Sequence, residues 1–204
     1  MTAAPDITAA PTGPTTSHRR ALGLNAALGL ALFALAGVVG AWIGSAALLA
    51  AAAALLARAG AQATEASDGG LTSEQRRFVQ LMLGVTLAAV VFAAVGEWLR
   101  RLVFGGAPDA AALGRLALLM LVVSVLGATR LLPHRAGEGG AKGLWRVAGD
   151  EVIADLALIA AAALLILIRS RWPDLLAAAL IGVRARRGVM TSLVAAWTVI
   201  RGQK

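Results

Sequence analysis

The sequence contains no cysteine and no tyrosine, and only two of its 204 residues are histidine. Without cysteine, disulfides and thiolate metal ligands are excluded. His18 and His134 both lie outside the apolar runs, so no histidine is available as a base inside an apolar segment. Because no pair of nucleophile and base can be placed, we do not expect an enzyme.

Charged residues are also scarce. They make up 15% of the chain, whereas hydrophobic residues make up 59% and the mean hydropathy is +0.78. This composition predicts an all-α, polytopic membrane protein. The net charge of +8 does not predict nucleic-acid binding, because the arginines gather at the ends of apolar runs. At those positions they set topology and meet anionic headgroups, so membrane lipid is the first expected partner.

The apolar runs are long enough for six transmembrane helices. We expect spans at about residues 22–43, 46–63, 78–98, 111–132, 148–168 and 174–200, which together form one transmembrane domain over residues 21–200. Residues 1–20, rich in Pro, Thr and Ala, are predicted to be a disordered cytoplasmic tail, and residues 201–204 a short second tail. The distribution of basic residues between the two ends of the spans predicts that both termini are cytoplasmic.

Three carboxylates open the fifth expected span: Asp150, Glu151 and Asp155. Ionisable groups inside a span are costly, and they tend to face a bundle interior or a watery path. Arg58 lies roughly 20 Å into the second span, where it either snorkels to the interface or joins an internal ion pair. For the acids three interpretations stay open: a solvated interfacial cluster, an internal ion-pair lock, and a cation or proton path.

The sixth expected span is interrupted by Arg184, Arg186 and Arg187. Neither apolar half alone reaches the roughly 20 residues that a span needs. Either the arginines occupy an aqueous or protein-lined break, or the second half lies along the interface as an amphipathic segment. The three arginines are candidates for interfacial anchoring, for binding lipid phosphate or a partner's carboxylates, and for transport of a substrate anion.

Several motifs give the chain a likeness to a known family. They are SAALLA after Gly44, EWLRRLVFG at the end of the third span, and RVAGD followed by WPDLLAAALIG. Over about residues 20–200 the chain resembles the transmembrane domain of cation diffusion facilitator transporters, in the short bacterial form without a cytoplasmic metal-binding domain. The resemblance implies a six-helix bundle in the bacterial inner membrane, exchange of a divalent cation such as zinc for protons, and a homodimer.

The family's four ligand positions are changed in this chain. Carried over by the resemblance, they fall on Ala54, Arg58, Arg146 and Asp150, or on Val147 and Glu151 in the fifth span after a shift of one residue. At most one position keeps a carboxylate, so Asp150 and Glu151 are the remaining candidate metal ligands, and no other cofactor is expected. We interpret Arg58 as the replacement for the ion, paired with Asp150 and with Glu151 or Asp155 nearby.

Two functions follow from this reading. The chain is either a non-transporting or altered relative of zinc-type efflux transporters, or a structural accessory subunit that packs against a larger membrane protein complex.

Overall fold

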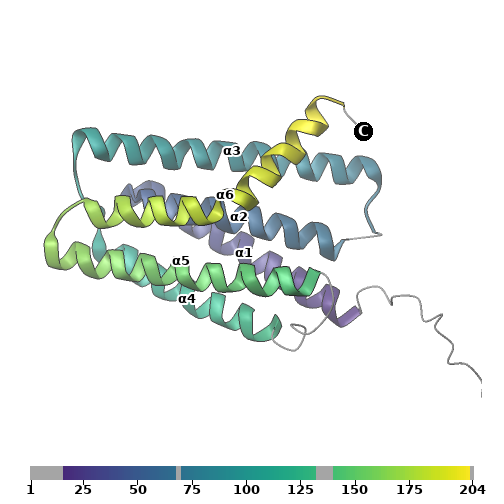
Figure 1. Ribbon diagram of the computed structural model, residues 1–204, viewed down its shortest axis with the longest axis horizontal. Helices are drawn as coiled ribbons and strands as arrows, with labels where there is room; N and C mark the ends of the chain where they lie inside the picture. Colours follow the sequence, from purple (N-terminus) through teal and green to yellow (C-terminus); the bar gives the residue numbers. More distant parts are fainter. Residues whose placement is uncertain (1–15, 68–69, 132–139, 203–204) are drawn as a thin grey trace, which may run out of the picture.

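The described part of the chain is entirely helical. The computed structural model describes residues 16–67, 70–131 and 140–202, with side-chain surroundings for residues 20–67, 70–130 and 149–202, and no strand occurs among them. The helices are α1 (Thr16–Ile43), α2 (Ala46–Ala66), α3 (Ser73–Phe104), α4 (Ala110–Leu131), α5 (Gly140–Ile168) and α6 (Trp172–Ile200). Consecutive helices run in opposite directions through one bundle (Figure 1). Residues 16–20, expected in the tail, are part of α1, and residues 1–15 of that tail lie outside the described residues.

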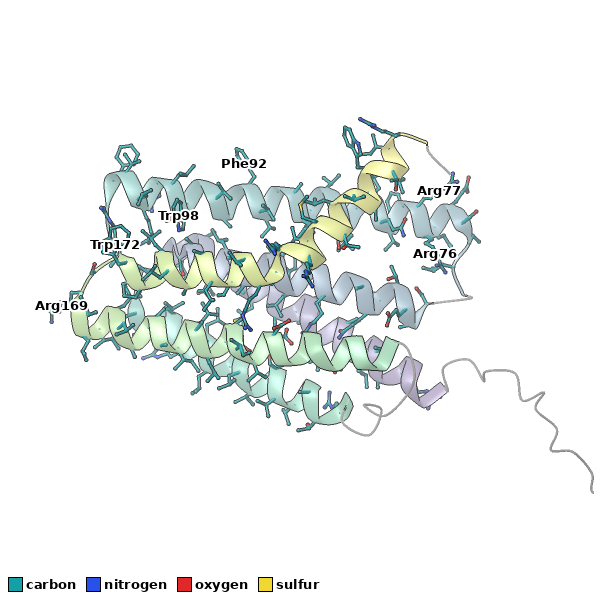
Figure 2. All side chains as sticks on the ribbon, viewed as in Figure 1. Arg76, Arg77, Phe92, Trp98, Arg169 and Trp172 are labelled. Carbon is teal, nitrogen blue, oxygen red and sulfur yellow. The ribbon has the colours of Figure 1, made fainter. Side chains whose placement is uncertain are left out.

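Five helices, α1 to α5, are long and apolar enough to cross a membrane. Arg169 and Trp172 lie toward one end of the bundle, and Arg76 and Arg77 lie toward the opposite end (Figure 2). Basic and tryptophan side chains are typical of the two interfaces of a membrane protein. Between these ends Phe92 points away from the bundle and is 82% exposed, as a side chain that faces lipid would be. The prediction of a helical membrane protein is therefore supported by five apolar helices of sufficient length, and not by six.

The sixth helix is not among these five. It carries Arg184, Arg186 and Arg187 near its middle, which lowers its hydropathy, yet the helix is continuous from Trp172 to Ile200. One of the two expected alternatives, an aqueous or protein-lined break at the arginines, is therefore not a break in the helix itself. In Figure 1 the yellow second half of α6 turns away from the first half and crosses α3. Gly84 and Ala196 meet at this crossing, so closely that a Cβ on Gly84 would overlap the Cβ of Ala196.

Helix α2 lies at the centre of the bundle. It is the most buried of the five apolar helices, and many of its residues are alanine. Small side chains allow neighbouring helices to approach closely. A Cβ added to Gly40 of α1 would lie 3.0 Å from the Cβ of Leu48, so this glycine permits the contact between α1 and α2. Leu48 and Ala52 are fully buried, and α2 therefore presents almost no surface to lipid.

A carboxylate from α6 fixes the start of α2. Asp174 accepts hydrogen bonds from the Ser45 hydroxyl at 2.5 Å and from the backbone N–H groups of Ala46 at 3.0 Å and Ala47 at 3.4 Å. These N–H groups have no partner within the helix, and the helix dipole favours an anion at this end. Both Ser45 and Asp174 are fully buried. The contact thus sets the position of α6 against α2.

A second polar network lies at the same end of the bundle. The buried guanidinium of Arg101 donates to Glu97, to the carbonyl of Ile43 and to the carbonyl of Gly106, each at 2.9 Å. It therefore joins the end of α3 to the end of α1 and to the loop before α4. Cations are favourable at helix C-terminal carbonyls such as that of Ile43.

Candidate functional site: a buried polar cluster between α2 and α5

An ion pair joins α2 to α5 inside the bundle. The guanidinium Nη1 of Arg58 contacts the Oε2 of Glu151, and the two side chains are only 15% and 10% exposed. Arg58 lies 12 residues into α2, which is about 18 Å along the helix axis. Gly29 of α1 faces the guanidinium, because a Cβ placed there would be 3.6 Å from Arg58 Nη2. The arginine is therefore directed into the protein interior.

A second carboxylate lies one helical turn beyond Glu151. Asp155 is four residues further along α5, so both side chains are on the same face of the helix. It is 1% exposed and lies close to the Arg58 guanidinium and the Ser124 hydroxyl, although no hydrogen bond of good geometry reaches its Oδ2 within the described residues. Two carboxylates thus share the surroundings of one guanidinium.

The ion pair borders a small cavity of about 20 Å³. Its walls also include Asn25 of α1, Gln62 of α2 and Ser124 of α4, which are 6%, 2% and 4% exposed. A cavity of this size has room for about one water molecule or one small ion. We call the six polar residues Asn25, Arg58, Gln62, Ser124, Glu151 and Asp155 the buried polar cluster.

Oxygen atoms dominate this cluster. The side-chain oxygens of Asn25, Gln62 and Ser124, the Oε1 of Glu151 and the Oδ2 of Asp155 are buried without a hydrogen-bond partner among the described residues, whereas the Oε2 of Glu151 contacts Arg58. Buried polar atoms in proteins are almost always paired with protein groups, water or ions. Buried oxygen acceptors from four helices therefore meet at one place in an apolar bundle. This arrangement favours a bound water molecule or ion between them.

A second ion pair lies outside the cluster. Arg184 of α6 donates to Asp150 of α5 at 3.1 Å, and the two side chains are 37% and 51% exposed. Asp150 was the first expected partner of Arg58, with Glu151 or Asp155 nearby; the structure pairs Arg58 with Glu151 and places Asp155 close to it, while Asp150 binds Arg184. Consecutive residues on a helix point about 100° apart, so α5 directs Glu151 towards α2 and Asp150 towards α6.

The remaining expected site residues are more dispersed. Arg186 and Arg187 are exposed on α6, and Arg186 borders a separate apolar groove. Of the four ligand positions implied by the resemblance, Ala54 and Arg58 carry no metal-binding atom, and the side chain of Arg146 lies outside the described residues. Within the described ranges no group of three His, Asp or Glu side chains could hold a metal ion. Asp150 and Glu151 do not converge on a common ligand site.

Gln62 and Ser124 were not predicted to be site residues, and the sequence favoured a contact between helices over a transport role for Asn25. Asn25, Gln62 and Ser124 are each isolated polar residues in apolar runs, a pattern more typical of single contacts between helices. The available signal was spacing, because Gln62 follows Arg58 by four residues just as Asp155 follows Glu151. Each pair therefore occupies one helix face.

Neither a known protein family nor a curated protein matches the sequence. The fold and the site together define a class: an all-helical membrane protein with a charged, oxygen-rich cluster buried among four of its helices.

Proposed function

We propose that this protein is a six-helix membrane protein built on a scaffold like that of the cation diffusion facilitators, in which an internal ion pair has replaced the divalent-cation site. The observation that carries the proposal is the buried contact between Arg58 of α2 and Glu151 of α5. These are the two helices that hold the transported ion in the family that the chain resembles. The protein keeps the bundle closed at this level without exporting zinc-type ions.

Electrostatics supports this reading. A guanidinium cannot lose its proton in a protein, so Arg58 is a permanent positive charge in the place of a ligand. A dication brought within about 4 Å of it would meet a repulsion of several kcal/mol even at an effective dielectric constant of 20. Zinc also needs about four nitrogen, oxygen or sulfur donors in a tetrahedron, and Ala54 supplies none. A divalent ion would therefore bind here far more weakly than in a complete site.

The membrane setting follows from the same proposal. We place the protein in the bacterial inner membrane with both termini in the cytoplasm, and we assign α6 as the sixth span. Although its central arginines lower its hydropathy, Arg184 is paired with Asp150. Pairing of this kind lowers the cost of a charge at membrane depth.

Zinc flux tests the proposal. Full-length protein in liposomes with a zinc-sensitive dye inside and an imposed pH gradient is expected to give no flux above that of empty liposomes. The triple variant Ala54→His, Arg58→Asp, Arg146→His keeps Asp150 and rebuilds the four positions that the resemblance implies. We expect it to bind Zn²⁺ at least tenfold more tightly than wild type, because Zn²⁺ gains donors and loses a repelling charge. Zinc flux by the wild type that Asp150→Asn abolishes would contradict the proposal.

An accessory subunit is the second candidate function, and an apolar groove favours it. The groove has a volume of about 340 Å³ and lies between α2, α3 and α6. Its walls include Ala50, Ala94, Ala179 and Gly182. Small residues of this kind allow a transmembrane helix of another subunit to approach closely.

Filling the groove tests this alternative. A Cβ at Gly182 meets nothing within 4 Å, so Gly182→Leu occupies the groove without disturbing the fold. Gly96→Leu is the matched control, because Gly96 is an equally open helical position on α3 that does not line the groove. An accessory role predicts that a stoichiometric partner co-purifies from native membranes with wild type and with Gly96→Leu, and is lost with Gly182→Leu. Loss in both variants, or in neither, would count against this groove as the contact.

A further inference from the structure

The charges of the buried polar cluster do not balance. Glu151 and Asp155 contribute two negative charges, and Arg58 is the one cation that lines the cavity within the described part of the chain. The other nearby arginine with a described partner, Arg184, is paired with Asp150 outside the cluster. The cluster therefore carries a net charge of minus one inside a bundle of apolar helices. An uncompensated buried charge is strongly unfavourable, and the described residues supply no second cation at the cavity, so the cluster favours a further positive charge.

The uncharged members of the cluster point to how that charge is held. Asn25, Gln62 and Ser124 each place an oxygen at the cavity without a hydrogen-bond donor from the described residues. They come from three different helices and are at least nine-tenths buried. Neutral oxygens beside carboxylates are the ligands of hard cations, and oxygen ligands near the membrane midplane hold coupling ions in secondary transporters.

We propose that the buried polar cluster binds one monovalent metal cation, Na⁺. One such charge brings the cluster to zero. A divalent ion would give the cluster a net charge of plus one, beside the guanidinium of Arg58, which stays protonated. The cavity of about 20 Å³ admits one small ion or one water molecule but not a hydrated ion with its shell. The cation contacts Asn25, Gln62 and Ser124, and it holds α1, α2, α4 and α5 together.

This inference uses the same contact between α2 and α5 as the proposed function, and it rests on that proposal insofar as no dication occupies the site. Its test measures binding of monovalent ions and not zinc flux. A protein that transports no zinc and does not respond to Na⁺ would overturn this inference alone, and a protein that transports zinc and also binds Na⁺ would overturn the proposed function alone.

The experiment follows the thermal stability of the full-length protein in detergent. Na⁺ is titrated against choline at constant ionic strength and pH 8, and the pH is lowered in a parallel series that contains choline only. We expect a saturable rise in Tm of about 3 °C or more with Na⁺, because an ion that binds the folded state alone stabilises it. A rise in Tm that occurs on acidification in choline and not with Na⁺ would contradict a sodium site.

Isosteric variants distinguish the site from general salt and pH effects. Asp155→Asn and Glu151→Gln each remove one negative charge and bring the cluster to zero without an ion. Both are expected to lose the response, whereas Asp150→Asn, the neighbouring and exposed carboxylate, keeps it. Binding of radioactive ²²Na⁺ to the same four proteins is the direct measurement. The proposal is overturned if wild type does not respond to Na⁺, or if Asp155→Asn and Glu151→Gln respond to Na⁺ as wild type does.

Discussion

Arg58 and Glu151 form an ion pair between α2 and α5 that is almost completely buried. The residue next to Glu151, Asp150, binds Arg184 of α6 at 3.1 Å. Two consecutive carboxylates of α5 therefore reach two different helices at one level of the bundle. The inner pair is enclosed by α1 and α4, and the outer pair is open to the surroundings. Both are arginine–carboxylate pairs. Because their burial differs, we expect them to contribute differently to the free energy of unfolding.

The inner pair should respond strongly to the loss of one partner. Arg58→Met leaves Glu151 and Asp155 without a cation, and removal of one partner of a buried pair typically costs about 3–5 kcal/mol. The double variant Arg58→Met, Glu151→Met replaces the pair by apolar side chains of similar length and should recover most of that loss. Denaturant unfolding in detergent, followed by tryptophan fluorescence, measures the free energies. Equal losses in the single and double variants would show that the pair does not lock the two helices.

The outer pair provides a contrast. Arg184→Met should lower the free energy of unfolding by less than Arg58→Met does, because Arg184 and Asp150 lie at the surface of the bundle, 37% and 51% exposed, and Asp150 is not enclosed by other helices when the arginine is lost. The same unfolding assay serves for this variant. A loss as large as that of Arg58→Met would mean that the Asp150–Arg184 pair is buried in the membrane or by a partner.

Much of this arrangement could be read from the sequence, but the choice of partners could not. Apolar runs and their flanking charges are local properties, and they placed the helices and the depth of Arg58. Whether Arg58 meets Asp150 or Glu151 depends on the rotation of α5 about its axis, and one residue changes that rotation by about 100°. Packing of the whole bundle sets this rotation. The same is true of Ser124, which enters the cluster only because α4 lies beside α5.

Helix α6 is a second case in which the local sequence alone does not determine the structure. Local composition predicted that Arg184 to Arg187 would interrupt a span, and these residues do lower the hydropathy of α6. The helix continues through them because arginine has high helix propensity. The capping role of Asp174, in the first turn of α6, was also not predicted from the sequence. Its role as the cap of another helix depends on a contact with Ser45, 129 residues away in the sequence.

Asp174 should be a strong determinant of stability. Asp174→Ala removes the acceptor for the Ser45 hydroxyl and for two N–H groups of α2, and hydrogen bonds to a charged group contribute about 1.5–3 kcal/mol each. We expect a loss of at least about 2 kcal/mol, and Ser45→Ala should cost about 1 kcal/mol, as typical N-cap losses do. Hydrogen exchange should also become faster at the amides of residues 46–48. Unchanged exchange in Asp174→Ala would contradict the capping role.

Arg101 and Arg100 are adjacent arginines with different expected effects. Arg101 is 3% exposed and makes three hydrogen bonds, so Arg101→Met should lower the free energy of unfolding by about 3 kcal/mol. Arg101→Lys should not restore it, because one ammonium group cannot reproduce the planar fork that reaches Glu97, Ile43 and Gly106 together. Arg100 binds only Glu97 among the described residues and is exposed, so Arg100→Met should show no measurable change. Similar Tm values for Arg101→Met and Arg100→Met would refute this distinction.

The crossing of α3 and α6 depends on a glycine. A Cβ at Gly84 would overlap the Cβ of Ala196, so Gly84→Ala should push the second half of α6 away from α3 and cost about 1–3 kcal/mol. Gly96→Ala, at an open position of the same helix, should instead be neutral or stabilising, because alanine favours the helix. The exchanged pair Gly84→Ala, Ala196→Gly moves the methyl group across the interface and should restore the contact. Crosslinking between cysteines placed at Leu87 and Leu193, which belong to the same hydrophobic cluster, reports whether the two helices stay together. If Gly84→Ala crosslinks as efficiently as the exchanged pair Gly84→Ala, Ala196→Gly, the close approach at Gly84 does not hold α6 in place.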